Sequence, residues 1–457
     1  MKGLTFQELA RLTDSPVRTA SFKLPKGYES FVQCMEGFEK FDILVHEIFM
    51  LRPIYGLKDA PRSWRIALHR CLLKLKARSL FADQAIYVWH NSKHELVLIV
   101  SAHVDDLKMA GFPAMLTWVL AELTSAFGKL KVQRMNFEHC GIWHRQNEAF
   151  EIRLDQNHYV KSLNPINTHD MDLSKPATPL TTSQHSEYLS LLGGCSWMNQ
   201  TRMDTPIYIQ ALQRASKSPT IAHVVRLNLV CRWMKRKPSS LLYARIPGVL
   251  KVLVISDAAF RREDLSGLAM RGGIVCIAET RADDPGGRIQ VMDFWSKRQR
   301  RVVRSTYGAE LNSLCDSMEV GKLIAYALTE VLSPQLNLSE LRQIDESGTF
   351  PVCIQAVIDC RSVYDSLAGT DTKTPSEASL VFLLLMIKQD LTRGSLSTLW
   401  WIDTRDMLAD GLNKGLVART QLLRSSSTGR WLLQHERRAF SHNKCSGDRQ
   451  DALEEDS

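Results

Sequence analysis

Apolar runs separated by polar turns predict a chain of mixed strands and helices. An apolar run at 96–104 reaches two adjacent carboxylates, Asp105 and Asp106, and a second apolar run then leads to Gly111. This pattern predicts a β-hairpin with both aspartates at or beside its turn. Because neighbouring aspartates repel each other, the pair suits a cation-binding turn. A solvated Asp-Asp turn is the alternative.

Helical and extended patterns follow this hairpin. A helix, two strands and the start of another helix are expected at 118–127, 137–142, 150–154 and 156–159. Residues 168–183 are rich in Ser, Thr, Pro and Asp, which is typical of a linker. The next stretch, 184–240, carries only helical patterns, among them an amphipathic helix with a basic end at 223–235. We therefore expect an all-helical region after the linker.

In the second half of the chain, short apolar strands lead to acids. One such strand ends at Asp257 and another at Asp359, and a helix is predicted from Ser305, a suitable N-cap, with Glu310 in its first turns. Further strands and a long apolar helix are expected at 272–278, 291–295, 378–392 and 398–402. Asp410 comes last. Each acid alone also fits a solvated strand end, a helix-dipole partner or a helix cap.

The composition is that of a globular chain with an excess of basic residues. Its 457 residues suggest two or three domains, and the formal net charge of +9 suits an acidic partner such as nucleic acid, although many basic proteins bind none. The ten cysteines form no Cys-x-x-Cys pair, which favours reduced thiols and an intracellular location, cytoplasmic or nuclear. The sequence shows neither a signal peptide nor an apolar run of about 18 residues, so we expect no membrane partner.

Residues 55–64 read Tyr-Gly-Leu-Lys-Asp-Ala-Pro-Arg-Ser-Trp. This segment resembles the Tyr-Gly-Leu-Lys-x-Ala-Pro-Arg-x-Trp block of Ty1/copia-type retrotransposon Pol polyproteins. In that family a Tyr-Val-Asp-Asp polymerase hairpin follows at about this distance, and here Val-Asp-Asp stands at 104–106. The chain is therefore similar to the reverse transcriptase and ribonuclease H portion of a copia-type Pol protein, from residue 1 to about residue 416.

The resemblance implies a mixed α+β and α/β fold in three parts. These are a partial reverse transcriptase palm with an antiparallel sheet and helices, a helical thumb or connection region, and a C-terminal ribonuclease H-like α/β domain. The expected bounds are 1–167 for the palm, 168–183 for the linker, 184–245 for the helical region, 246–418 for the ribonuclease H-like domain, and 419–457 for a polar, disordered tail.

The resemblance also implies roles in the polymerase part. Asp105 and Asp106 would be catalytic and bind metal, and Lys58 and Arg62 would contact phosphates unless they form a solvated basic turn. Residues 1–3 resemble the end of an element that follows the family's first catalytic Asp, so that Asp is expected to precede residue 1. Because two-metal nucleotidyl transfer needs carboxylates that bridge both ions, we expect an incomplete polymerase site.

Four acids in the later half match the ribonuclease H pattern: Asp257, Glu310, Asp359 and Asp410. The sequence is also close to the copia-type pattern at 295–299, 305–310 and 408–414. The resemblance implies that the four acids converge, bind two Mg²⁺ ions about 4 Å apart and catalyse hydrolysis of the RNA strand of an RNA–DNA hybrid. Mn²⁺ is an alternative ion. The hybrid would be selected through 2′-hydroxyl contacts and groove shape.

The basic residues near the predicted site have two interpretations. Arg298 and Arg301 belong to an arginine cluster beside the Glu310 helix, and this cluster either follows the phosphates of the hybrid or forms a solvated face.

Three functional hypotheses remain open. The first is a ribonuclease H with an incomplete polymerase site, and the second is a fully active reverse transcriptase with a mis-set start, which would also bind an RNA/DNA template-primer. The third is a non-catalytic remnant that binds nucleic acid. The sequence does not determine the oligomeric state.

Overall fold

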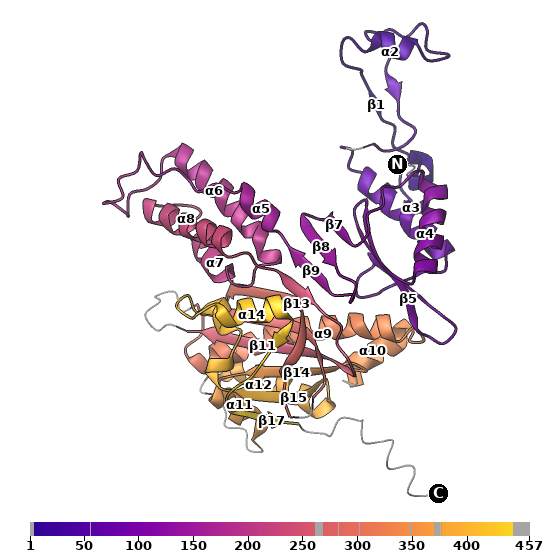
Figure 1. Cartoon of the computed structure of the whole chain (residues 1–457). Helices are drawn as coiled ribbons and strands as arrows, with labels where there is room; N and C mark the ends of the chain where they lie inside the picture. Colours follow the sequence, from indigo (N-terminus) through magenta and orange to yellow (C-terminus); the bar gives the residue numbers. More distant parts are fainter. Residues whose placement is uncertain are drawn as a thin grey trace, which may run out of the picture. The chain divides into compact units, whose positions relative to one another are not determined.

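The fold is taken from a computed structural model. It describes residues 4–54, 56–260, 268–281, 283–300, 302–347, 350–369, 375 and 377–441. The chain divides into two compact units: unit 1 runs to Val132 and includes Val331–Gln335, and unit 2 comprises the remainder. The main division thus falls after residue 132, whereas the sequence predicts it at 168–183. Figure 1 shows the elements of each unit along the chain.

Unit 1 is built on an antiparallel sheet with the strand order β3-β4-β5-β6. Its strands are β3 (Arg78–Ser79), β4 (Ile86–His90), β5 (Leu96–His103) and β6 (Asp106–Gly111). Helices α3 (Ala60–Lys74) and α4 (Pro113–Phe127) bury leucines and valines against this sheet, and α4 contains the helix expected at 118–127. The shorter elements of unit 1 are α1 (Phe6–Thr13), β1 (Ser21–Phe22), α2 (Glu29–Gln33) and β2 (Ile48–Phe49).

Strands β5 and β6 form the predicted hairpin. His103 pairs with Asp106, and Val104 and Asp105 make the turn, with Val104 at φ 53°. The indole Nε1 of Trp64, on α3, donates a hydrogen bond of 2.6 Å to the carbonyl oxygen of Val104. The tryptophan of the segment 55–64 therefore holds the turn that carries the two aspartates. The hairpin prediction is confirmed.

Unit 2 begins with a small antiparallel sheet and a group of helices. The sheet has the order β10-β9-β8-β7, formed by β7 (Asn136–His139), β8 (Ile142–Gln146), β9 (Ile152–Asp155) and β10 (Leu241–Tyr243). The helices are α5 (Asn157–Ser162), α6 (Thr182–Trp197), α7 (Pro206–Arg214) and α8 (Ile221–Arg236). Strand β10 lies after the stretch expected to be all-helical, 184–240, but within the helical domain bounds 184–245, which are therefore wrong for that short strand.

The predicted linker 168–183 is part of this helical group. Just before it, Ile166 donates its backbone N–H to Asn228 Oδ1 and accepts a hydrogen bond from Asn228 Nδ2 at 2.8 and 2.9 Å. Ile166, Met171 and helix α8 share one apolar core. The stretch has the irregular structure that its composition predicts, but it does not separate two compact units.

The rest of unit 2 is an α/β domain on a seven-stranded sheet with the order β16-β13-β12-β11-β14-β15-β17. Strands β11 (Leu250–Ala259), β12 (Met270–Glu279) and β13 (Gly287–Arg298), which include the strands expected at 272–278 and 291–295, form an antiparallel meander. Strands β14 (Cys353–Ile358) and β15 (Leu396–Ile402) continue the sheet parallel to β11. The mixed α/β architecture expected of a ribonuclease H-like domain is therefore present.

Helices bury apolar side chains on both faces of this sheet. One face carries α9 (Thr306–Leu332), α11 (Arg361–Ala368) and α12 (Ala378–Arg393), and the other face packs against α13 (Asp410–Asn413) and α14 (Thr420–Thr428). Helix α10 (Leu338–Ser347) follows α9. The N-cap predicted for α9 is confirmed, because Gly308 donates its backbone N–H to Ser305 Oγ at 3.1 Å. None of the described helices is long and apolar enough to cross a bilayer.

The expected disordered tail, 419–457, is wrong for its described part. Residues 420–428 form α14, in which Leu422, Ser425 and Ser426 are buried. Two short strands follow: β16 (Arg430–Trp431) pairs with β13, and β17 (Arg437–Phe440) pairs with β15. The residues after 441 lie outside the described part of the chain.

Candidate metal site

Three of the predicted acids lie together beside two neighbouring strands. Asp257 is near the end of β11, and Asp359 directly follows β14. These strands are parallel, and Ile255 pairs with Val357, so residues 257 and 359 lie side by side at this end of the two strands. Glu310, in the second turn of α9, completes the group. One carboxylate oxygen from each acid lies within 4.8 Å of the others.

The segment 295–299 and strand β11 hold Glu310 in place. Gln299 Nε2 donates a hydrogen bond of 2.7 Å to the carbonyl oxygen of Ala309, which fixes the first turns of α9. Glu310 Oε2 accepts a hydrogen bond of 3.0 Å from the backbone N–H of Ala258. These contacts aim a buried carboxylate at the strand ends, where the other acids lie.

The fourth acid, Asp410, joins the group through Lys414. Asp410 begins α13, and the Lys414 ammonium forms ion pairs with Asp410 Oδ1 and, at 3.1 Å, with Asp257 Oδ2. Asn413 Nδ2 also donates a hydrogen bond of 2.6 Å to Asp257 Oδ2. Helix α13 approaches this closely because Gly272, which pairs with Asp257 across the sheet, has no side chain.

The acids differ in the ease with which they ionise. Burial, followed by the charge of Asp257, raises the pKa of Asp359 to about 6. Burial and the interaction with the Asp257 carboxylate raise the pKa of Asp410 to about 8, and burial with two neighbouring carboxylates raises the pKa of Glu310 well above its usual value. Burial opposes the charge on Asp257, but the charge of Lys414 and the hydrogen bonds to this carboxylate together outweigh burial and lower the pKa of Asp257.

The residues present fit a divalent cation. Asp257 Oδ1 is buried and accepts no hydrogen bond from the described residues, although the other oxygen of this carboxylate has two donors. An ion would give that oxygen a partner and would relieve the repulsion that raises the pKa of Glu310 and Asp359. Carboxylate oxygens are the ligands that Mg²⁺ and Mn²⁺ prefer. Asp257, Glu310 and Asp359 would hold the ion.

Sequence reasoning did not assign three polar residues of the site. Asn413 and Lys414 contact Asp257, and Thr404 Oγ1 donates a hydrogen bond of 2.8 Å to Asp359 Oδ2. The spacing of Asp410 and Lys414, four residues apart, is a signal that could have identified the lysine. Thr404 and Asn413 offered no comparable signal.

The predicted polymerase residues lie in unit 1 and form a separate constellation. Asp105 and Asp106 are exposed at the hairpin, Lys58 is exposed just before α3, and Arg62 is exposed in the first turn of α3. Among the described residues, the group of three or more potential metal ligands is the one in unit 2. The roles of these four residues therefore stay predictions.

The predicted phosphate contacts in unit 2 lie before α9. Arg298 is half-buried at the end of β13. Arg301 lies outside the described residues. Their contacts with nucleic acid stay predictions.

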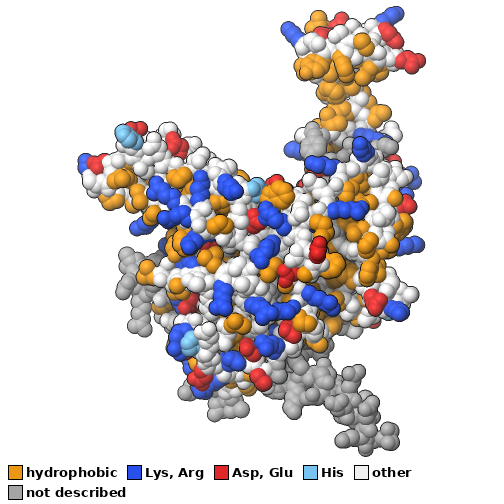
Figure 2. All heavy atoms as spheres, viewed as in Figure 1, with side chains coloured by type: hydrophobic (Ala, Val, Ile, Leu, Met, Phe, Trp, Pro, Cys, Tyr) orange, Lys and Arg blue, Asp and Glu red, His pale blue; other side chains and the backbone are white. Residues whose placement is uncertain are grey.

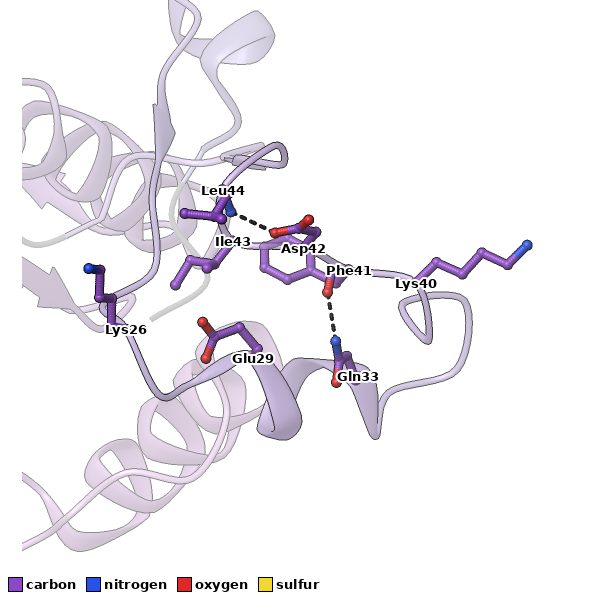
Figure 3. A pocket seen from close by; sticks show the side chains of 8 residues that line it. All are labelled: Lys26, Glu29, Gln33, Lys40, Phe41, Asp42, Ile43 and Leu44. Carbon is purple, nitrogen blue, oxygen red and sulfur yellow. Dashed lines mark hydrogen bonds between the residues drawn. The ribbon is translucent and has the colours of Figure 1, made fainter.

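A pocket of about 560 Å³ lies in unit 1, and its lining includes Phe41 and Asp42. Figure 3 shows two of its internal hydrogen bonds, from Gln33 Nε2 to the carbonyl oxygen of Phe41 and from Leu44 N to Asp42 Oδ1, both 2.8 Å. The lining contains none of the predicted site residues. We therefore assign no chemistry to this pocket.

The substitution Asp359→Asn is expected to stabilise the metal-free protein by an amount that grows with pH. Folding raises the pKa of Asp359 from 3.8 to about 6, so the folded protein binds this proton more tightly than the unfolded chain does. The stability that the bound proton contributes is fully present below pH 3.8 and is lost as the pH rises through about 6. An amide does not titrate. The melting temperature of the variant minus that of the native chain should therefore rise by roughly 5 °C between pH 4.5 and 7.5.

Thermal unfolding in EDTA measures this difference, and Asp365→Asn, at an exposed position on α11, is the control. Saturating Mg²⁺ should reverse the order at pH 7.5, because the native carboxylate gains an ion. A difference that is constant across the pH range would contradict the pKa assignment.

The substitution Gly272→Ala is expected to displace α13. An added Cβ would lie 2.8 Å from both the carbonyl oxygen of Ala409 and the Cβ of Leu412. We expect a loss of about 1–3 kcal/mol in unfolding free energy and weaker Mg²⁺ binding by calorimetry, since Asn413 and Lys414 move with the helix. Gly193→Ala on α6, where a Cβ meets open space, is the matched control and should be neutral or slightly stabilising. Native stability in the Gly272 variant would contradict the close approach.

The chain is similar in sequence to two plant polyproteins. No protein-family model matches the chain. The retrovirus-related Pol polyprotein from transposon RE1 of Arabidopsis thaliana is 23% identical over 379 residues, which is 80% of this chain and 24% of that protein. The corresponding polyprotein from transposon RE2 of the same plant is 25% identical over 402 residues, which is 85% of this chain and 25% of that protein. The chain thus spans about a quarter of the length of these relatives.

A solved structure of a foamy viral protease-reverse transcriptase in complex with dsDNA aligns at 10% identity with a TM-score of 0.43, covering 78% of this chain and 61% of that chain. The alignments to the plant polyproteins are long enough to include residues of both units. The resemblance that the sequence motifs indicate is therefore confirmed by the plant relatives. Over about four fifths of its length, this chain is similar to retrovirus-related Pol polyproteins from transposons.

Proposed function

We propose that unit 2 is a divalent-metal-dependent ribonuclease H, which hydrolyses the RNA strand of an RNA–DNA hybrid. The observation that carries this proposal is the convergence of Asp257, Glu310 and Asp359, with Asp410 adjoining them through Lys414. The order of strands around these acids and the similarity to Pol polyproteins support it.

The residues of the site would have different roles in this reaction. Two bound Mg²⁺ ions would supply a water of lowered pKa and would neutralise charge on the departing oxygen. The side chains of Asp257 and Glu310 are buried, so bulk water has little access to their carboxylates. Thr404 and Asn413 each hold one oxygen of a neighbouring carboxylate, so that the other oxygen is free to bind an ion. Preorganised ligands of this kind need little rearrangement when the substrate arrives.

Basic side chains support the choice of a polyanionic substrate. Figure 2 shows Lys and Arg side chains distributed over the visible face of unit 2. The exposed basic residues of α8 are Arg226, Arg232, Lys235 and Arg236, and Arg300 and Arg304 are exposed before α9. We infer that such residues neutralise backbone phosphates, which makes binding weaker as salt increases.

The proposal is tested by cleavage of an end-labelled RNA–DNA hybrid with the full chain. We expect RNA fragments in Mg²⁺ or Mn²⁺, none in EDTA, and none with single-stranded RNA. Asp257→Asn should abolish cleavage, and Asp170→Asn, at an exposed position outside the site, is the control that should retain it. Hybrid binding without cleavage by the native chain would instead support a non-catalytic nucleic-acid-binding protein.

DNA polymerisation is the alternative activity, and one observation favours it: the Val-Asp-Asp sequence lies at a hairpin turn that Trp64 holds. In the described part of the chain, however, no third potential metal ligand groups with Asp105 and Asp106. We therefore propose cleavage as the activity. Extension of a DNA primer on an RNA template, abolished by Asp106→Asn, would show that polymerisation occurs as well.

A further inference from the structure

We propose that the Lys414 ammonium is a tethered cation, which fills one of the cation positions of the acidic site until a second divalent ion displaces it. This inference rests on the proposed metal site and adds a control over its occupancy. It predicts that the protein without nucleic acid binds one ion readily and binds the second only when Lys414 leaves.

The two oxygens of Asp257 have different surroundings. Oδ2 accepts from Asn413 and forms the 3.1 Å ion pair with Lys414, whereas Oδ1 has no hydrogen-bond donor among the described residues. Asp257 therefore presents one open oxygen for an ion and one oxygen that already contacts a cation. The ammonium also pairs with Asp410, so it bridges the two acids in the way that a metal ion would.

A divalent ion and the ammonium cannot share this position. Mg²⁺ binds carboxylate oxygens at about 2.1 Å, and an ion on Asp257 Oδ2 and Asp410 would lie in the space that Lys414 Nζ takes. Like charges at such a distance repel strongly in a poorly hydrated site. Lys414 must therefore withdraw before Asp257 Oδ2 and Asp410 can bind an ion together.

The backbone that carries Lys414 is fixed by neighbouring elements. Arg419 Nη2 donates a hydrogen bond of 2.9 Å to the carbonyl oxygen of Lys414, and the hydroxyl of Tyr208, on α7, donates one of 2.7 Å to the carbonyl oxygen of Gly415. The Arg419 guanidinium lies over the Tyr208 ring, 5.1 Å from its centroid. These contacts hold the backbone of Lys414 beside the site.

The side chain itself is free to leave. It is 32% exposed, so its flexible stem can carry the ammonium into solvent by rotation about its own bonds. When it leaves, the negative charges of Asp257, Asp410 and Asp359 face the incoming ion alone. A fixed backbone and a movable charge are the two properties that a displaceable cation needs.

The first test is calorimetric titration of the full chain with Mn²⁺ at low salt. Lys414→Met keeps most of the stem and removes the charge, so we expect its second ion to bind at least about tenfold more tightly than in the native chain. Lys414→Arg should bind the second ion as weakly as the native chain does. Lys217→Met, which replaces an exposed lysine between α7 and α8, is the matched control.

The second test uses the native chain and so does not depend on the folding of a variant. Acetylation of lysines by an amine-reactive ester, followed by mass spectrometry, should show Lys414 becoming severalfold more reactive as Mg²⁺ fills the site. Lys217 should not change.

The outcomes separate the two proposals. Equal binding of two ions by the native chain and Lys414→Met, with unchanged labelling of Lys414, would overturn the tethered-cation proposal and leave the metal site standing. Failure of both proteins to bind any ion would overturn the metal site and the tethered cation together.

Discussion

Replacing Glu310 by Gln is expected to slow hybrid cleavage by about 10³-fold or more and, at the same time, to stabilise the metal-free protein. Glu310 is buried, and burial with the charges of Asp257 and Asp359 raises its pKa well above the usual value. A glutamine keeps an oxygen that can accept the hydrogen bond from Ala258 and removes the repulsion. It also lacks the charge that would balance a divalent ion.

The rate is measured on the labelled hybrid in Mg²⁺, and stability is measured by thermal unfolding in EDTA. Glu319→Gln, at an exposed position on the same helix, is the matched control, and both quantities should stay near their native values. A glutamine variant that cleaves normally would remove Glu310 from the site. A variant that is both inactive and less stable than the native chain would instead indicate a structural role.

The second large effect is expected outside the group of acids, in the helical group of unit 2. Arg202 and Asp204 form a fully buried ion pair with two hydrogen bonds of 3.0 and 2.7 Å. Trp233 Nε1 also donates to Asp204, and Arg202 Nη1 donates to the backbone carbonyls of Met234 and Lys237. The pair therefore fixes the C-terminal end of α8.

Asp204→Ala is expected to cost about 3–5 kcal/mol of unfolding free energy, because it leaves the arginine buried without its counterion. The double variant Arg202→Met, Asp204→Leu should cost much less, since neither charge is then buried. Urea denaturation followed by tryptophan fluorescence measures both. Asp365→Ala, which breaks an exposed pair with Arg361, should change the free energy by no more than about 0.5 kcal/mol. Equal losses for the single and double variants would show that side-chain packing dominates over charge.

Asp257, Glu310 and Asp359 were predictable because each follows a strong local pattern. Strands β11 and β14 are buried almost throughout, so their apolar runs are continuous and end where the acids begin. The Ser305 cap likewise depends on near neighbours in the sequence. No local sequence pattern identifies the partners that come from distant segments of the chain. Asn413 and Thr404 meet their carboxylates only because α13 closes over Gly272 and because β15 lies beside β14.

The polar segments were predicted poorly for a related reason. Composition suggested a linker at 168–183 and a disordered tail from 419, yet both stretches carry a few buried residues that anchor them. Met171 is buried in the apolar core that it shares with α8, and Trp431 is fully buried, with its Nε1 donating a hydrogen bond of 3.1 Å to the carbonyl oxygen of Asp406. A single tryptophan outweighs several serines in burial energy, and an average over composition hides it.

Strand β17 determines how far the C-terminal end of this protein can be shortened. It covers the outer edge of β15 by pairing Arg437–Phe440 with Leu399–Ile402. Cutting the chain at 418, the end that motif boundaries suggest, would uncover the backbone N–H and C=O groups of a strand that carries two tryptophans. Open edges of that kind recruit other chains, so the shortened protein is expected to self-associate on gel filtration while a version ending at 441 stays monodisperse.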